Sequence, residues 1–153
     1  MMKWAYWSIA LLLLAGGGAV VYTKTRGLRN NNPGNIRYNS YNNWVGQVGQ
    51  DGDGFVIFDK PVNGIRAMAR TLQSYRNRGI VTVDQIISTW APSIENNTQS
   101  YIDEVYRRTG WERPFLPSKE EGDYLALIKA MISHENGLNP YPDSLIKQGI
   151  AAA

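Results

Sequence analysis

The sequence lacks cysteine entirely and contains a single histidine, His134. A zinc peptidase draws its protein ligands mainly from histidine and cysteine, so that class is almost excluded. Cysteine-nucleophile amidases are excluded outright, and a Ser-His-Asp hydrolase would depend on His134 alone. Disulfides cannot form, which neither supports nor forbids an extracytoplasmic location. From this composition we expect no cofactor and no metal site.

The charge excess is small: the net charge is +3 and the isoelectric point is near 9.2. This charge suits an anionic surface such as cell wall or lipid, and it is too weak to indicate nucleic acid as a partner. The chain of 153 residues has room for one soluble domain.

The N-terminus holds the long apolar run of the chain, from Trp4 to Tyr22, without a charged residue. Its length and its terminal aromatic residues are typical of a membrane-spanning helix. We therefore expect a transmembrane helix over residues 1–23, in contact with lipid, and one domain over residues 24–153. A cleaved signal peptide with a core at Ile9–Ala15 is the alternative.

Residues 26–38 are rich in asparagine and glycine, which indicates an ordered loop of Asx turns. Two short strands are predicted next, at 44–48 and 55–58, joined by a turn at 51–54. Amides and aromatic rings together are typical of a sugar site, and they serve equally to satisfy a loop and fill a core. For Asn35, Tyr38 and Trp44 both interpretations stay open.

Helical patterns follow the predicted hairpin. Asn63 is a candidate cap for a helix ending near Gly79, and Thr82 with Gln85 forms a capping box. Asn96 or Asn97 begins another helix, and Gly110 ends it. Several short helices and one small hairpin predict the α+β class, mainly helical.

The last predicted helix carries an acid on its apolar face. Ser118 and Glu121 form a candidate capping box, and Gly137 is placed to end the helix. Glu135 continues the apolar line through Ile128 and Met131, so we expect its carboxyl to be partly desolvated. Desolvation and the negative end of the helix dipole both raise a carboxyl pKa, as a general acid requires. The alternative is a solvated glutamate in the last turn.

Glu95 is a second candidate carboxylate, between an aromatic residue and a helix N-terminus. That position would lower its pKa and suit a base or a stabiliser of positive charge on the sugar. Assistance in capping the following helix is the simpler interpretation, and it is favoured.

The segment LIKAMISHENGLNP, residues 127–140, resembles the catalytic-helix signature of soluble lytic transglycosylases and goose-type lysozymes. Asn136 stands where those families usually have serine. The signature opens the domain in those families, whereas here it comes near the end of the sequence. The resemblance therefore implies a circularly rearranged lysozyme-like fold, with the hairpin and the asparagine-rich loop first.

A second resemblance covers nearly everything from Gly27 to Pro142. The motifs GLRNNNPGNIR, GIRA, WAP and HENG, in that order, are similar to those of a bacteriophage and prophage family of structural or lytic proteins. Members resemble the murein-degrading protein of membrane-containing phages, which implies a domain that opens peptidoglycan during entry or lysis. Trp90 of WAP, Asn136 of HENG and Tyr101, which begins a Tyr-Ile pair between those two motifs in the same resemblance, are expected to bind substrate.

Together these observations predict a membrane-anchored phage enzyme that acts on peptidoglycan, with Glu135 as the acid. One firm carboxylate favours a lytic transglycosylase over a muramidase that uses water. The enzyme would reside in the virion membrane or the host inner membrane, act in the periplasm and contact other virion proteins. The alternatives are a non-catalytic virion structural protein with a glycan-binding domain and, third, a murein peptidase.

Overall fold

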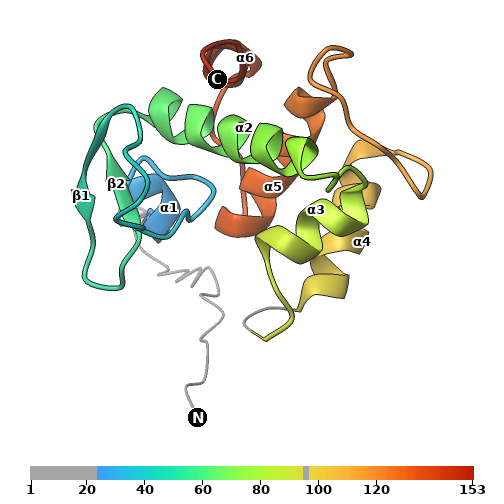
Figure 1. Ribbon diagram of the computed structural model, residues 1–153, viewed down its shortest axis with the longest axis horizontal. Helices are drawn as coiled ribbons and strands as arrows, with labels where there is room; N and C mark the ends of the chain where they lie inside the picture. The colour runs from blue at the N-terminus through green and yellow to red at the C-terminus, as the bar shows by residue number, and fades with distance from the viewer. Residues whose placement is uncertain (1–23, 95–96) are drawn as a thin grey trace, which may run out of the picture.

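The computed structural model describes residues 24–94 and 97–153, which form helices around one small sheet (Figure 1). The elements in chain order are α1 (Arg26–Arg29), β1 (Gln47–Gln50), β2 (Val56–Phe58), α2 (Pro61–Asn77), α3 (Val83–Trp90), α4 (Thr98–Thr109), α5 (Asp123–Asn136) and α6 (Asp143–Ala151). Figure 1 shows the hairpin and α1 near one end of α2, and α3 and α4 near the other.

The predicted hairpin is present. Strands β1 and β2 pair antiparallel, with Gln50 opposite Val56 and an irregularity after Gln47. In the connecting turn, Asp51 Oδ1 accepts hydrogen bonds from two backbone N–H groups, which is the local bonding expected of an Asx turn. The buried Val56 and Phe58 pack on Ala67 of α2 and make a small second core. Strand β1 begins three residues later than the sequence pattern indicates.

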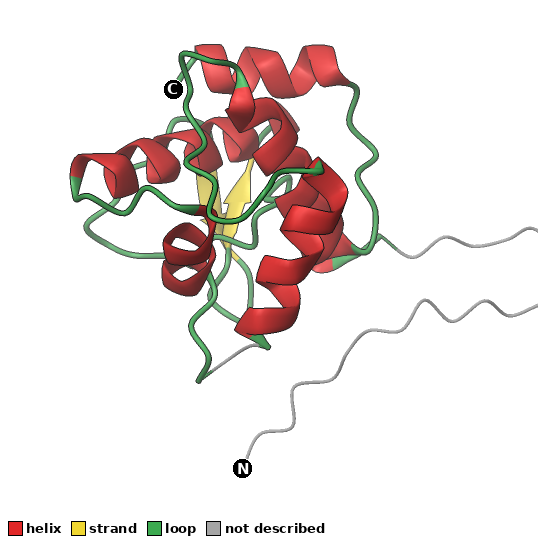
Figure 2. Ribbon diagram, turned by 90° about the vertical axis from the view of Figure 1, so that its right-hand side faces the viewer, coloured by secondary structure: helices red, strands yellow, loops and turns green. Residues whose placement is uncertain are grey.

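Helix α5 lies at the centre of the main core. Its apolar side chains are buried on several faces, and it contacts α1, α2, α4 and α6. In Figure 2 the two strands lie behind the helices, near the middle of the view. Gly137, at φ +77°, ends α5 in the left-handed conformation as predicted. The capping box at Ser118 was wrong, because α5 begins at Asp123 and the Ser118 hydroxyl donates to Glu120 instead.

Two of the remaining helices begin at the capping residues that the sequence predicts, and two do not. The capping box of Thr82 and Gln85 is confirmed at the start of α3, and Asn97 accepts from the backbone of Ser100 at the start of α4. Helix α2 begins at Pro61, before the expected cap. Helix α6 was not expected, and it packs against α2 where Gly149 lets the backbone approach.

The fold class expected from the sequence was wrong in its membrane-spanning helix. In the part of the chain that the structure describes, no helix is long and apolar enough to cross a membrane. The longest is α2, whose 17 residues include arginines on one face, whereas a bilayer requires about 20 mostly apolar residues. Residues 1–23, on which the expectation rested, lie outside the described residues.

Gly64 provides a test of how α2 meets the asparagine-rich loop. A Cβ at this position would overlap the backbone oxygen of Asn31, so Gly64→Ala forces the loop and the helix apart. Overpacking of this kind costs about 1–3 kcal/mol, which exceeds the gain in helix propensity. We expect a lower midpoint of urea unfolding. Gly49→Ala is the control, because no atom lies within 4 Å of its added Cβ. Equal midpoints for the two variants would contradict the packing described.

Candidate active site

The carboxylate of Glu135 receives hydrogen bonds from three side chains on separate segments. Trp90 Nε1 donates to Oε1 over 3.1 Å, and the Tyr101 hydroxyl donates to the same oxygen over 3.1 Å. Asn35 Nδ2 donates to Oε2 over 3.0 Å. The last turn of α5, the end of α3, the first turn of α4 and the loop after α1 thus meet at one carboxylate.

The loop after α1 holds Asn35 through a buried asparagine. Asn32 is fully buried, and its Nδ2 donates to the backbone oxygens of Ile36 and Val56 while its Oδ1 accepts from the Ile36 N–H. The loop is therefore bonded to strand β2. Asn35 has φ +48°, in the left-handed region that asparagine tolerates better than most residues. This backbone conformation accompanies the contact of its amide with Glu135.

The ring of Trp90, the last residue of α3, packs on the loop after α1. A Cβ on Gly34 would stand 2.8 Å from both the Trp90 ring and the Met68 side chain, so the loop backbone packs directly on them. Helix α3 is anchored in turn by Asp84, which accepts hydrogen bonds from Arg113 and from the Tyr106 hydroxyl. The indole N–H of Trp90 is thereby directed at Glu135 from a fixed helix end.

Tyr101 is positioned by a histidine and a second carboxylate. The buried Tyr101 ring stacks on His134, with centroids 3.6 Å apart. His134 Nδ1 lies 2.6 Å from Glu104 Oε2, and Arg108 Nε donates to the other Glu104 oxygen. Burial opposes ionisation of Glu104, but the bonds from His134 and Arg108 prevail and lower the pKa of its carboxyl. A carboxylate only accepts, so His134 Nδ1 carries a proton.

The pKa of the Glu135 carboxyl is raised above its ordinary value. Burial is the largest cause, and it outweighs the hydrogen bonds from Asn35, Trp90 and Tyr101 and the charge of His134, all of which lower the pKa. The residue as a whole is half-buried. The Tyr101 pKa is raised well above its usual range, first by burial and then by Glu135, which keeps this phenol a neutral donor.

Asn136 lies next to the site but is bonded within the protein. It is buried, its Nδ2 donates to the backbone oxygens of Pro33 and Ile132, and its Oδ1 accepts from the Thr25 hydroxyl. The side chain thus ties the end of α5 to the N-terminal loop. Its expected contact with substrate stays a prediction.

Tyr38 and Trp44 belong to the hairpin region. Tyr38 is 39% exposed, and the half-buried Trp44 packs against the small core of Val56 and Phe58. Neither is among the side chains that bond to Glu135. Glu95 lies outside the described residues. The structure brings Asn35, Trp90 and Tyr101 to Glu135, and their expected contact with substrate stays a prediction. The pairing of His134 with Glu104 had no signal in residue spacing.

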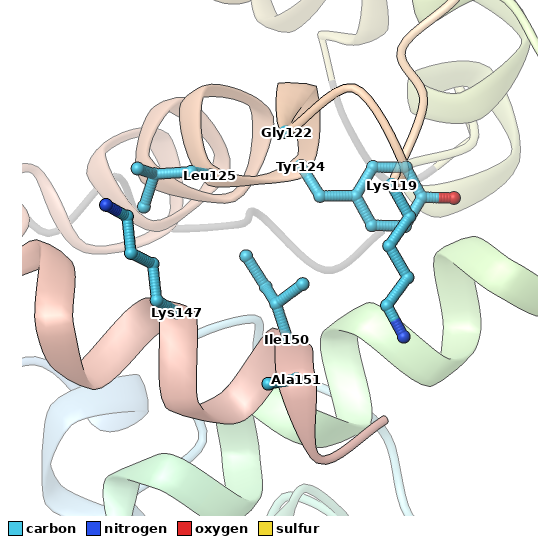
Figure 3. A pocket seen from close by; sticks show the side chains of 7 residues that line it. All are labelled: Lys119, Gly122, Tyr124, Leu125, Lys147, Ile150 and Ala151. Atoms are coloured by element: carbon cyan, nitrogen blue, oxygen red, sulfur yellow. The ribbon is translucent and has the colours of Figure 1, made fainter.

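A shallow pocket lies elsewhere on the molecule, between the start of α5 and α6 (Figure 3). Its volume is about 190 Å³, and its walls include Lys119, Tyr124, Leu125 and Lys147. None of the residues that surround Glu135 lines it, so we place the candidate site at Glu135 on chemical grounds. The described residues contain no group of three acidic, histidine or cysteine side chains able to hold a metal ion.

The raised pKa of Glu135 predicts a pH-dependent effect on stability. A carboxyl whose pKa is higher in the folded protein than in the unfolded chain stabilises the fold at low pH, and this contribution is lost as pH rises through the folded pKa. We expect Glu135→Gln to increase the free energy of unfolding relative to wild type above that pKa. Urea titrations across a pH series measure this difference, and a constant difference would contradict the shift.

Comparison with known proteins places the chain among bacteriophage proteins. No protein-family model matches it. It is 45% identical over 128 residues to protein P5 of Pseudoalteromonas phage PM2, which covers 81% of this chain and 79% of that protein. The bacteriophage part of the expected resemblance is thereby confirmed, whereas lytic activity stays a prediction. The chain belongs to the family of protein P5 of Pseudoalteromonas phage PM2.

Proposed function

We propose that this protein cleaves the glycan strands of peptidoglycan as a lytic transglycosylase, with Glu135 as both acid and base. The observation that carries the proposal is the Glu135 carboxyl itself, half-buried, raised in pKa and bonded by three uncharged donors. Groups with these properties are typical of sites that transfer protons near neutral pH.

In the proposed reaction Glu135 first gives up its proton and then receives one back. The protonated carboxyl gives its proton to the glycosidic oxygen as the bond from that oxygen to C1 breaks, which leaves positive charge on the sugar ring. The C6 hydroxyl of the same sugar then attacks C1 and returns a proton to the carboxylate. The products are a shortened strand and an anhydro sugar, and water is not consumed. Trp90, Tyr101 and Asn35 stabilise the carboxylate between the two steps.

The groups that bond to Glu135 fit a transglycosylase, which needs one carboxylate. A hydrolase normally places a second carboxylate about 5–9.5 Å from the acid. Among the described residues, the side chains that bond to Glu135 are an amide, an indole and a phenol. Glu104 is engaged by His134 and Arg108 rather than turned to Glu135. A mechanism that needs one carboxylate fits this arrangement.

Membership in a bacteriophage family supports the host cell wall as the substrate and the virion as the place where the protein is carried. The aromatic Tyr38 and Trp90 retain exposed surface and provide faces on which sugar rings could stack. The non-enzymatic alternative is a virion structural protein that contacts other virion proteins, and it is distinguished by the absence of cleavage products.

Digestion of purified peptidoglycan by the full chain tests the proposal. We expect mass spectrometry to show anhydro-muropeptides with the wild type and a loss of about 10²–10⁴-fold with Glu135→Gln, because the amide cannot donate a catalytic proton. Glu121→Gln is the matched control, since Glu121 is exposed and is not among the side chains that bond to Glu135. Reducing ends would indicate a hydrolase, and no products from any variant would favour the structural alternative.

The Tyr101 hydroxyl predicts a shift of the pH profile. Tyr101→Phe keeps the ring that stacks on His134 but removes a donor that lowers the pKa of Glu135. The acid form then persists to higher pH, so the basic limb of the rate profile moves upward. Tyr106→Phe is the control, because its hydroxyl donates to Asp84. Identical profiles for wild type and Tyr101→Phe would contradict the role of this bond.

A further inference from the structure

The amide of Asn35 has one satisfied end and one unsatisfied end. Its Nδ2 donates to Glu135 Oε2 over 3.0 Å, whereas its Oδ1 is buried without a hydrogen-bond partner. A buried amide oxygen without a donor destabilises the conformation that holds it. In the orientation that lets Asn35 donate to an ionised Glu135, its amide oxygen therefore lacks a hydrogen bond.

The unsatisfied oxygen and two other acceptor oxygens lie around one point beside Gly27. Asn35 Oδ1, the backbone oxygen of Asn32 and Asn136 Oδ1 all lie within 3.1 Å of the point where a Cβ on Gly27 would stand. Gly27 is buried and has no side chain, so the three oxygens gather beside its backbone. Each of these oxygens accepts hydrogen bonds and none donates, so a donor in place of Asn35 Oδ1 would improve the local bonding.

When Glu135 is protonated, its carboxyl has a hydrogen bond to donate to Asn35 instead of one to accept from it. Oε1 already accepts from Trp90 and Tyr101, so the acidic proton belongs on Oε2, which faces Asn35. A protonated Oε2 would then meet the N–H groups of Asn35, donor against donor. Rotation of the amide by half a turn presents its oxygen to the Glu135 proton. The same rotation brings the NH₂ group to the point beside Gly27 that the oxygens of Asn32 and Asn136 also approach.

We propose that Asn35 is a positioning residue whose side-chain amide turns over each time Glu135 gains or loses its proton. Asn35 donates to the carboxylate and accepts from the carboxylic acid, so both forms of Glu135 stay bonded. The catalytic significance of this rotation rests on the proposed function, in which Glu135 alternates between acid and base. The rotation itself depends only on the protonation of Glu135 and is measured without substrate.

The charged groups around Glu135 must be separated from this effect. His134 precedes Glu135 on α5 and acts on it electrostatically, and Glu104 and Arg108 on α4 are joined to His134. Tyr101 on α4 is kept neutral by burial, and α3 contributes the uncharged Trp90. Glu135→Gln leaves all of these in place. Its amide N–H mimics the protonated acid at every pH, so Asn35 should remain turned.

Nuclear magnetic resonance of the isotopically labelled full chain tests the rotation. We expect strong nuclear Overhauser effects from the Asn35 amide protons to the Gly27 Hα at low pH. They should weaken at high pH with the midpoint of the Glu135 carboxyl ¹³C titration, and persist at all pH values in Glu135→Gln. Effects that are independent of pH while Glu135 titrates, or that are absent in Glu135→Gln, would overturn the proposal.

Two glycine variants test the role of the amide in turnover. Asn35 and Asn31 both have positive φ, +48° and +52°, so glycine keeps either backbone conformation while removing the side chain. The Asn31 amide donates to the Phe58 oxygen rather than to Glu135. We expect Asn35→Gly to lower kcat about tenfold with little change in KM, and to move the basic limb of the profile to higher pH. Asn31→Gly should leave that limb in place.

The outcomes distinguish the two proposals. Amide rotation without any cleavage of peptidoglycan would retain the inference and reject the proposed function. Cleavage through Glu135 with an amide that does not rotate, or with an unchanged pH profile in Asn35→Gly, would do the reverse.

Discussion

The interaction on which the rest of the structure depends is the half-buried carboxylate of Glu135 and its three donors. Removing a carboxylate from water is costly unless hydrogen bonds replace the lost solvation. Here the replacements come from Asn35, Trp90 and Tyr101, which belong to three different segments. Each segment must be held in place for the carboxylate to be bonded. The hydrogen bonds of the site therefore depend on the packing of the whole domain.

The asparagine-rich loop is held in place by side-chain hydrogen bonds rather than by regular secondary structure. Asn32 bonds the loop to itself and to β2, and Asn136 bonds it to the end of α5. Gly27 and Gly64 permit close approach of backbone where a side chain would collide. Most asparagines of this loop therefore serve the scaffold, and Asn35 is the member whose amide reaches the acid. A composition that suggests sugar binding is here largely the means of folding a loop.

The charged side chains of Glu104 and Arg108 act on Glu135 indirectly, through His134. Glu104 and Arg108 fix His134, and His134 stacks on the phenol that donates to Glu135. Burial raises the pKa of Glu135, while the neighbouring donors and His134 limit the rise. Such opposed effects raise the pKa of a carboxyl without keeping it protonated at every pH. Acid–base catalysis uses carboxyl groups of this kind.

The sequence by itself determined the features that local signals encode. The hairpin, the capping box at Thr82, the glycine ends of α4 and α5, and the apolar line that raises the pKa of Glu135 were all predicted from short-range patterns. Local patterns also misled. The candidate capping box at Ser118 was not used, and the expected membrane-spanning helix has no counterpart among the described helices.

Only the tertiary structure decided which residues meet at the acid. Asn35 lies 100 positions from Glu135 along the chain, Trp90 lies 45 and Tyr101 lies 34. Periodicity and capping report on neighbours within a few turns, and they contain no information on contacts at such separations. Those contacts are set by how α3, α4 and the loop pack around α5, since the buried carboxylate is stable only where their donors converge.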